Sequence, residues 1–273
     1  PLSLESQLVV MRKSAPLIVQ GGRRIAVFTN RPAQTPPALS LLFLHGFSQS
    51  SHSFSEGIAA LERQWASKTP ERTTAKGATS LACLAMDHAG HGESDAVRPA
   101  SEYSLALLLG DVHTFLTRSH ALTHGSVKIA VAMSMGGMLT CRVVEEAVAA
   151  GQPPPVDALV LVDVAPELTQ AGVAELFAVA AHPGFASLDE AFTVVRTMNP
   201  HRPADALRTR LQHALRWDDS VGRFVWRLDP AFAEQASGFV DSLFEQRAVR
   251  HLGIPVLLLR GGESKVLTAD AAT

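Results

Sequence analysis

The sequence has few cysteines, and no apolar run long enough to span a membrane. Its 273 residues include two cysteines, Cys83 and Cys141, each in an apolar segment with the character of a strand or helix. This pattern predicts buried thiols rather than a disulfide framework, which is typical of a reducing compartment and favours a cytoplasmic protein. No apolar stretch approaches the roughly 20 residues of a transmembrane helix. The N-terminus also lacks the basic-then-apolar pattern of a signal peptide.

Charge is sparse and nearly balanced. Lys and Arg number 24 against 26 Asp and Glu, so the formal net charge is −2, and 18% of the residues are charged. Because no block of Lys or Arg is present, nucleic acid is not an expected partner. With 47% hydrophobic residues, the chain can bury the core of one large domain, or of one domain with an insertion. We expect a globular protein that acts on a small molecule.

Strand-like and helix-like segments alternate through the first part of the chain. Apolar runs of strand length lie at residues 7–11, 24–28, 39–44, 81–86, 127–132 and 158–162. Helical periodicity is found at residues 53–68 and 103–119. Continuous apolar runs are typical of strands covered on both faces. The alternation therefore predicts an α/β fold with a mostly parallel central sheet and helices on both faces.

The pattern changes between residues 166 and 239. Amphipathic helical stretches predominate there, and only one short strand is expected, at residues 223–227. Trp217, Phe224 and Trp226 fit cap or core positions better than substrate contacts. Another apolar run follows at residues 255–259. We interpret residues 166–239 as a helical cap inserted after the sixth strand, and residues 1–165 and 240–273 as the core.

One short motif carries most of the chemical information: residues 132–137, with the sequence Ala-Met-Ser-Met-Gly-Gly. It lies between an expected strand and a helix-like run at residues 138–150. A serine in a tight strand-to-helix turn, with small residues two positions away on each side, is typical of a nucleophile elbow. Ser134 is therefore the candidate nucleophile, which would need a base to take its proton. The alternative is an ordinary serine that caps a helix N-terminus.

His45-Gly46-Phe47 follows the apolar run at residues 39–44 and is the candidate oxyanion loop. Attack on a carbonyl group builds negative charge on its oxygen, which fixed N–H donors can stabilise. We expect the backbone N–H groups of Phe47 and Met135 to be these donors. His45 belongs to the same candidate substrate-binding loop. The alternative is a simple turn at the end of a strand.

Residues 87–94 hold an aspartate, two histidines and a glutamate in a short loop after a strand. A metal site is one reading, but the spacing follows no usual ligand pattern. The glycines of this loop suit a turn that supports the site, so we predict a structural role and neither a metal nor another cofactor. Four further histidines fit surface or packing positions in or beside helices: His113, His120, His124 and His213.

In their order along the chain, these motifs resemble the α/β-hydrolase superfamily, in the capped group that includes esterases, lactonases and carbon–carbon bond hydrolases. The resembling segments are residues 45–47, 87–95, 132–137, 159–166 and 259–262. The resemblance implies a serine hydrolase that acts on an ester, a lactone or an activated carbonyl compound. It also implies an oxyanion hole and a cap over the substrate.

The catalytic acid departs from this family's pattern. Family members usually carry it in the loop after the strand at residues 255–259, where Lys265 stands in this chain. Because a lysine cannot orient a histidine in this way, Glu263 and Asp163 are the available substitutes. Some hydrolases of this fold place the acid after the sixth strand, which makes Asp163 the candidate. The alternative for Asp163 is a strand-end carboxylate that caps a nearby N–H.

The catalytic histidine is the second departure. The triad order in this fold is serine, acid, histidine, but the last histidine, His251, precedes the final predicted strand. The sequence begins at Pro1, and its last residues resemble the start of a helix that is cut short. We therefore expect the histidine beyond Thr273. The rival functions are a non-catalytic protein that binds a small ligand on this fold, and a cofactor-free lyase or haloperoxidase that reuses the elbow.

Overall fold

The computed structural model describes residues 11–30, 37–68, 81–119, 126–164, 181–198, 200–244, 252–264 and 267. The predictions for most of residues 7–11 and for His120, His124, His251 and Lys265 lie outside this part of the chain. None of the helices in the described ranges is long and apolar enough to cross a membrane.

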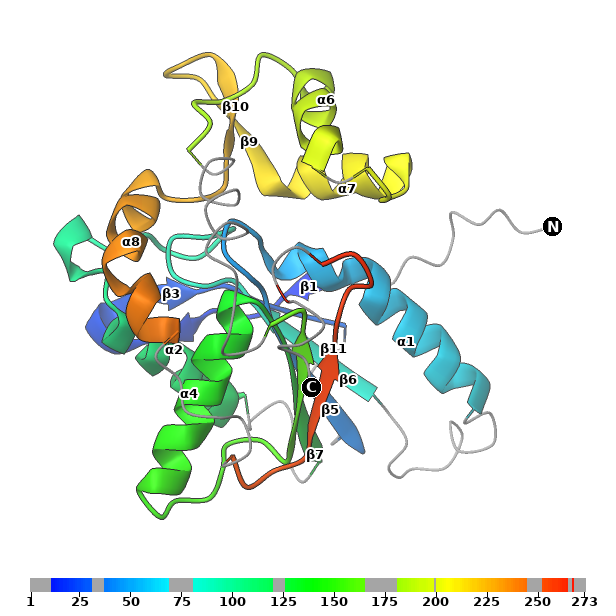
Figure 1. Cartoon of the computed structure of the whole chain (residues 1–273), viewed down its shortest axis with the longest axis vertical. Helices are drawn as coiled ribbons and strands as arrows, with labels where there is room; N and C mark the ends of the chain where they lie inside the picture. Colours follow the sequence, from blue (N-terminus) through cyan, green and yellow to red (C-terminus); the bar gives the residue numbers. More distant parts are fainter. Residues whose placement is uncertain are drawn as a thin grey trace.

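A seven-stranded sheet with the order β1-β4-β6-β5-β7-β8-β11 lies at the centre of the fold (Figure 1). Its strands are β1 (Arg12–Lys13), β4 (Val27–Thr29), β5 (Leu39–Leu44), β6 (Leu81–Met86), β7 (Val127–Met133), β8 (Ala158–Val162) and β11 (Val256–Leu259). The five strands from β6 to β11 in this order pair in parallel, whereas β1 and β4 pair antiparallel. The predicted mostly parallel sheet is confirmed.

Helices cover both faces of the sheet. They are α1 (Ser55–Lys68), α2 (Leu105–Arg118), α4 (Met135–Ala149) and α8 (Pro230–Phe244), and a short 3-10 helix, η3 (Ser51–Phe54), precedes α1. One apolar cluster joins the sheet to α2, α4 and α8. A second cluster joins the sheet to η3 and α1. Every residue of β6 is buried, as expected for a strand between two covered faces.

The predicted strand at residues 24–28 is divided in two, which corrects the prediction. Its first part, β3 (Arg24–Ile25), pairs with β2 (Leu17–Ile18), and its second part is β4. Ala26 lies between them, and its backbone bonds to the loop after β6 instead of to a strand. Its N–H donates to Ser94 Oγ at 2.9 Å, and its carbonyl accepts from Asp87 N–H at 3.0 Å. The loop thus takes the two hydrogen bonds that would have continued the strand.

Residues 181–198 and 200–228 form a second unit, called here the upper unit, which is stacked on one end of the core (Figure 1). It contains α6 (Leu188–Met198), α7 (Ala204–Ala214) and the hairpin of β9 (Leu215–Asp218) and β10 (Arg223–Trp226). It has an apolar cluster of its own, centred on Phe185, Leu207 and Leu211. The cap predicted at residues 166–239 stays a prediction. Its last part overlaps α8, which packs on the core through Phe232 and Phe239.

The strand predicted at residues 223–227 is present as β10, but its partner β9 was not predicted. β9 is short and carries two charged residues, so its apolar signal is weak. Its register opposes Trp217 to Phe224, and the two rings lie 5.1 Å apart. Cross-strand aromatic pairs of this kind stabilise hairpins. Elsewhere, Cys83 and Cys141 are free, buried thiols, as predicted.

Candidate active site

Backbone strain singles out one edge of the sheet. Among the described residues, the non-glycine residues with positive φ are Ser48 (56°), Ser134 (46°) and Asp163 (52°). They follow β5, β7 and β8, which are neighbouring parallel strands, so all three lie at the carboxyl edge. Such conformations cost about 1–3 kcal/mol each and cluster at functional sites. Ligands of open α/β sheets also bind at this edge.

Ser134 stands between β7 and α4 in an unusual conformation, with φ 46° and ψ −122°. It occupies the N-cap position of α4, yet its side chain makes no capping hydrogen bond. The same chain shows an ordinary capping serine for comparison. Ser104, at the start of α2, has an extended backbone and accepts a hydrogen bond from Leu107 N–H, as capping requires. The alternative prediction that Ser134 is an ordinary capping serine is therefore wrong.

Close packing explains the glycines around Ser134. A Cβ atom at Gly136 would lie 2.6 Å from the carbonyl oxygens of both Leu44 and His45. A Cβ atom at Gly137 would lie 2.5 Å from a methyl group of Val164. The start of α4 therefore rests directly on the ends of β5 and β8. Ala132, at the position where the elbow usually has glycine, is buried.

Ser134 and Asp163 begin side by side. The register of β7 and β8 pairs Met133 with Val162, and Ser134 N–H donates to the carbonyl oxygen of Val162 at 3.4 Å. Asp163 directly follows Val162, the last residue of β8. The sheet thus brings the predicted nucleophile and the predicted acid to adjacent strand ends.

The loop after β11 holds the carboxylate of Asp163. Its Oδ1 accepts a hydrogen bond from Gly261 N–H at 3.1 Å, and its Oδ2 accepts one from the Ser264 hydroxyl at 2.8 Å. The backbone N–H of Asp163 donates to Leu259 O at 2.7 Å. Asp163 therefore caps a nearby N–H, as its alternative interpretation expects, and its role as the catalytic acid stays a prediction. Ser264 was not predicted, since a serine in a strand-end loop has no distinctive signal.

Glu263, the other acid considered, points elsewhere. Its side chain is 79% exposed, and its Oε2 lies 2.9 Å from Nε2 of His201 in the upper unit. It therefore joins the loop after β11 to the loop between α6 and α7. No histidine among the described residues bonds to the carboxylate of Asp163, whose partners there are Gly261 and Ser264.

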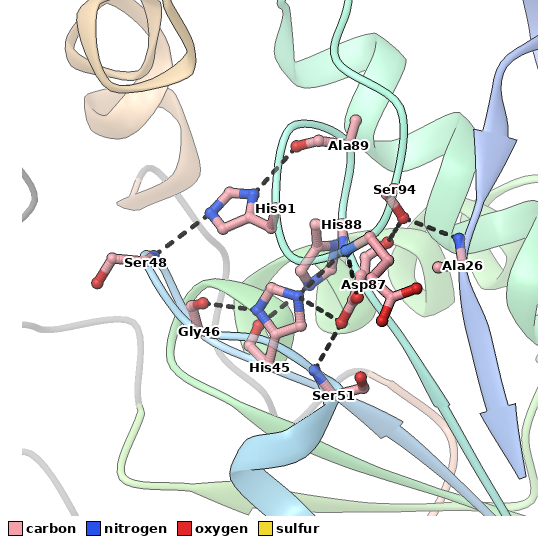
Figure 2. Close-up of polar contacts among 11 residues, drawn as sticks. Ala26, His45, Gly46, Ser48, Ser51, Asp87, His88, Ala89, His91 and Ser94 are labelled. Carbon is pink, nitrogen blue, oxygen red and sulfur yellow. Dashed lines mark hydrogen bonds and ion pairs between the residues drawn. The ribbon is translucent and has the colours of Figure 1, made fainter. Parts of the chain in front are cut away.

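Three buried histidines, His45, His88 and His91, cluster at the candidate oxyanion loop, to which His45 itself belongs (Figure 2). His45 Nδ1 donates to Gly46 O at 2.8 Å, and its Nε2 accepts from His88 N–H at 3.0 Å. His91 Nδ1 donates to Ala89 O at 3.0 Å, and its Nε2 accepts from Ser48 N–H at 3.3 Å. Because a carbonyl oxygen only accepts, the rings of His45 and His91 are each fixed as one neutral tautomer.

The electrostatics of the cluster agree with neutral rings. Burial lowers the pKa of His88 to about 3 and that of His91 to about 4. Burial, reinforced by the two neighbouring histidines, also holds the pKa of His45 well below its usual range. Desolvation disfavours the charged imidazolium, which would also lose the acceptor nitrogen that each N–H in this network needs. His45 has no exposed surface, so its side chain has no group left to offer a substrate.

Asp87 has a structural role in the same network. Its Oδ1 accepts from Ser51 N–H at 2.7 Å, and its Oδ2 accepts from Glu93 N–H at 2.9 Å. A Cβ atom at Gly92 would lie 2.1 Å from Oδ2, so only glycine fits there. Burial raises the pKa of Asp87. Across the described residues, no group of three or more His, Cys, Asp and Glu side chains could hold a metal ion.

The histidine network also orients the peptide between Gly46 and Phe47. The carbonyl of Gly46 points at the His45 ring and also accepts from Gln49 N–H at 3.3 Å. In a planar trans peptide, the C=O and N–H groups point in opposite directions. The N–H of Phe47 therefore points away from the His45 ring. Gly46 itself lies close to Ser134, because a Cβ atom on it would be 3.1 Å from Ser134 Cβ.

Comparisons with known proteins agree with this architecture. The chain is similar to E-2-(acetamidomethylene)succinate hydrolase, at 22% identity over 96% of this chain and 84% of that one, with a TM-score of 0.68. It is similar to an alpha/beta hydrolase from Novosphingobium aromaticivorans, at 20% identity over 96% and 86%, with a TM-score of 0.68. It is also similar to an esterase from Mycobacterium tuberculosis, at 25% identity over 97% and 78%, with a TM-score of 0.61.

A search of curated protein sequences finds no match. The sequence profile of one family, described as the alpha/beta hydrolase fold, matches residues 40–272. That match includes the strand ends with the three strained residues and the loop that holds Asp163. The chain therefore belongs to the alpha/beta hydrolase fold family.

Proposed function

We propose that the protein is a serine hydrolase that cleaves an ester, a lactone or an activated carbonyl compound, with Ser134 as its nucleophile. The observation that carries the proposal is the conformation of Ser134, which is strained and makes no capping bond. A strained serine between a parallel strand and a helix presents its hydroxyl above the sheet edge. Similarity to an esterase at 25% identity is consistent with this chemistry.

In this proposal, two backbone N–H groups stabilise the oxyanion. Met135 begins α4, and the first N–H groups of a helix have no acceptor within it and carry partial positive charge. The N–H of Phe47 is the second donor, directed away from the histidine cluster by the bond between His45 and Gly46. His45 then acts as a positioning residue, because it holds this peptide without touching the substrate.

Asp163 is the proposed acid. Hydrogen bonds from Gly261 and Ser264 hold its carboxylate, which in this proposal orients a histidine and stabilises the imidazolium. That histidine would take the proton from Ser134 as the oxygen attacks the carbonyl carbon, and would return it to the leaving group. Water would then release the acyl group from the serine by the reverse proton transfers.

A fluorophosphonate probe tests the proposal, because it labels only activated serines. We expect the native full chain to be labelled stoichiometrically at Ser134, and Ser134→Ala to abolish both labelling and hydrolysis of p-nitrophenyl esters. Ser104→Ala removes a capping serine and serves as the matched control, which should keep both. Absence of labelling in a folded native chain would count against a serine hydrolase.

A non-catalytic protein that binds a small ligand is the second candidate. It is favoured by the carboxylate of Asp163, whose partners in the described part of the chain are Gly261 and Ser264 and include no histidine. This candidate predicts neither fluorophosphonate labelling nor ester turnover in the native full chain. It further predicts that Ser134→Ala leaves ligand affinity unchanged.

A further inference from the structure

Phe47 lies between two peptide groups, each of which bonds to a buried histidine. The carbonyl oxygen of Gly46, in the peptide before Phe47, accepts a hydrogen bond from His45 Nδ1 at 2.8 Å (Figure 2). The N–H of Ser48, in the peptide after Phe47, donates to His91 Nε2 at 3.3 Å. Because peptide groups are planar, the backbone of Phe47 changes only by rotation between these two groups. Two held neighbours therefore leave the N–H of Phe47 little freedom.

Ser48 depends on such a contact more than most residues do. Its backbone is left-handed, with φ 56°, although it is not a glycine. A conformation of this kind is unfavourable and persists only where the surrounding structure determines it. The bond to His91 contributes to this, because it fixes the N–H of Ser48 itself. Without that bond Ser48 could relax, and the backbone of Phe47 would turn with it.

The ring of His91 is itself held in one place. It is 1% exposed, and its Nδ1 donates to the carbonyl oxygen of Ala89 at 3.0 Å. This bond leaves Nε2 as the acceptor that the N–H of Ser48 requires. The rings of Phe47 and Phe232 pack edge to face against it, with centroid distances of 6.2 and 4.6 Å. Burial, hydrogen bonding and packing thus give the ring one position and one tautomer.

The backbone of His91 is held by the end of the upper unit. His91 and Leu228 form an antiparallel bridge. Two backbone hydrogen bonds flank this bridge, at 2.8 and 2.7 Å, and they join Gly92 to Arg227 and Gly90 to Asp229. His91 therefore rests on a fixed backbone while its ring supports the candidate oxyanion loop.

The candidate oxyanion loop borders the candidate nucleophile directly. A Cβ atom at Gly46 would lie 3.1 Å from Ser134 Cβ, and one at Gly136 would lie 2.6 Å from the carbonyl oxygen of His45. A shift of this loop therefore changes where the N–H of Phe47 lies relative to Ser134. That N–H is the second donor in the proposed function, and a donor must lie about 2.7–3.1 Å from the oxyanion to stabilise it.

We propose that His91 is a positioning residue for the oxyanion hole: its Nε2 holds Ser48 and thereby keeps the N–H of Phe47 directed at the oxyanion. The proposal deepens the proposed function and rests on it for the role of Phe47. An oxyanion hole stabilises the transition state more than the bound substrate. Loss of the bond from Ser48 to His91 should therefore lower kcat and leave KM almost unchanged.

Three substitutions of His91 test this role. His91→Leu keeps an apolar side chain and removes the acceptor. In His91→Asn, the amide can replace Nδ1 as the donor to Ala89 but is too short to reach Ser48. This second variant provides the measurement if His91→Leu does not fold. His91→Gln is the conservative variant, because its longer side chain can bring an acceptor oxygen to Ser48.

Tyr103→Phe is the matched control. Tyr103 packs against the same ring of Phe232, at a centroid distance of 5.3 Å. Its hydroxyl accepts from Val97 N–H and donates to Asp229 Oδ2, so its hydrogen bonds do not involve the candidate oxyanion loop. Tyr103→Phe should lower the melting temperature and leave the kinetic constants unchanged.

The kinetic constants are measured with p-nitrophenyl esters, well below the melting temperature of each variant. We expect His91→Leu and His91→Asn to lower kcat by about threefold to tenfold, as expected for one hydrogen bond, with KM within about twofold of the native value. The inhibition constant of a matched trifluoromethyl ketone, which forms an oxyanion adduct with a serine, should rise by the factor by which kcat/KM falls. His91→Gln should recover part of both losses.

Two kinetic results would overturn the positioning role. One is a lower melting temperature for the leucine and asparagine variants of His91 with native kcat and a native inhibition constant, which would show a histidine that only stabilises the fold. The other is a higher KM with unchanged kcat, which would show a role in substrate binding instead.

Hydrogen exchange separates this proposal from the proposed function, because it requires no turnover. In Ser134→Ala, we expect the Ser48 amide to exchange about threefold to tenfold faster when His91→Leu is added, and at an unchanged rate when Tyr103→Phe is added. This result, with no ester turnover by the native full chain, would sustain His91 as the residue that holds the loop while the hydrolase proposal fails. Equal exchange of Ser48 with and without His91→Leu would overturn the positioning role, even in an active hydrolase.

Discussion

Gly136 shows how tightly the candidate active site is packed at the level of single residues. We predict that Gly136→Ala lowers the free energy of unfolding by about 1–3 kcal/mol. The added Cβ would lie 2.6 Å from two backbone carbonyl oxygens, and backbone cannot move aside as a side chain can. Because α4 would be pushed off β5, labelling of Ser134 should also be lost. Urea unfolding and fluorophosphonate labelling measure the two effects.

Gly110 provides the control for this substitution. It lies within α2, and a Cβ atom there would meet nothing within 4 Å. Gly110→Ala should therefore stabilise the protein by about 0.5–1 kcal/mol, since alanine is the better helix former. If both alanine variants were equally stable and equally labelled, the packing around Ser134 would not depend on glycine.

Single residues also show what the sequence could and could not predict. The tight turn at Ser134 was predictable, because small residues must flank such a turn and their spacing is visible in the sequence. Ser48 and Asp163 share its positive φ but carry no such pattern, because the surrounding contacts impose their conformation. The sequence predicted that His45 follows the strand at residues 39–44. It could not predict the burial of His45, because the contact involves His88, 43 residues away in the sequence.

At the level of elements, buried parallel strands were the easiest to predict. β5, β6 and β8 have the predicted bounds, because strands covered on both faces appear as continuous apolar runs. β9 is one strand of a two-stranded hairpin and has two exposed and two charged residues, so its apolar signal is weak. The strand at residues 24–28 divides because its middle residue bonds to a distant loop, which local pattern cannot reveal.

The loop after β11 provides a prediction at this scale. Ser264→Ala removes one of the two hydrogen bonds that hold the carboxylate of Asp163. If Asp163 is the acid, kcat for p-nitrophenyl esters should fall by about twofold to tenfold, as expected for one hydrogen bond, while KM stays unchanged. Ser264→Thr keeps the hydroxyl and should restore part of kcat.

A second substitution distinguishes the two acids. Glu263→Gln alters an exposed pair with His201 and should leave kcat within about twofold of the native value, because exposed ion pairs contribute little. Asp163→Asn should lower kcat far more than Ser264→Ala does. The reverse order of effects would make Glu263 the acid and leave Asp163 as a capping carboxylate.

At the level of the whole molecule, neutral histidines join the parts of the fold. His45, His88 and His91 connect the ends of β5 and β6 through backbone hydrogen bonds. His52 and His213 connect η3 to the upper unit by stacking. Each of these five rings has a lowered pKa, with burial as the largest cause. Their neutrality is therefore coupled to the folded state.

This coupling predicts acid sensitivity. The pKa of His91 falls from 6.5 to about 4 on folding, so the unfolded chain binds its proton first as the pH decreases. The associated stability is complete above about pH 6.5 and is lost as the pH falls from there towards 4; for one such buried group the loss is about 3 kcal/mol. We expect the melting temperature to fall by several degrees between pH 7.5 and pH 5.

Variants assign this loss to the buried cluster. His91→Gln removes one titrating group, so its melting temperature should be lower at pH 7.5 but should decrease less steeply towards pH 5. His113→Gln changes an exposed side chain on α2 and should follow the native curve. Equal slopes for the native chain and His91→Gln would mean that the acid sensitivity arises elsewhere. A melting temperature that stays constant from pH 7.5 to pH 5 would mean that the buried histidines are not held neutral by folding.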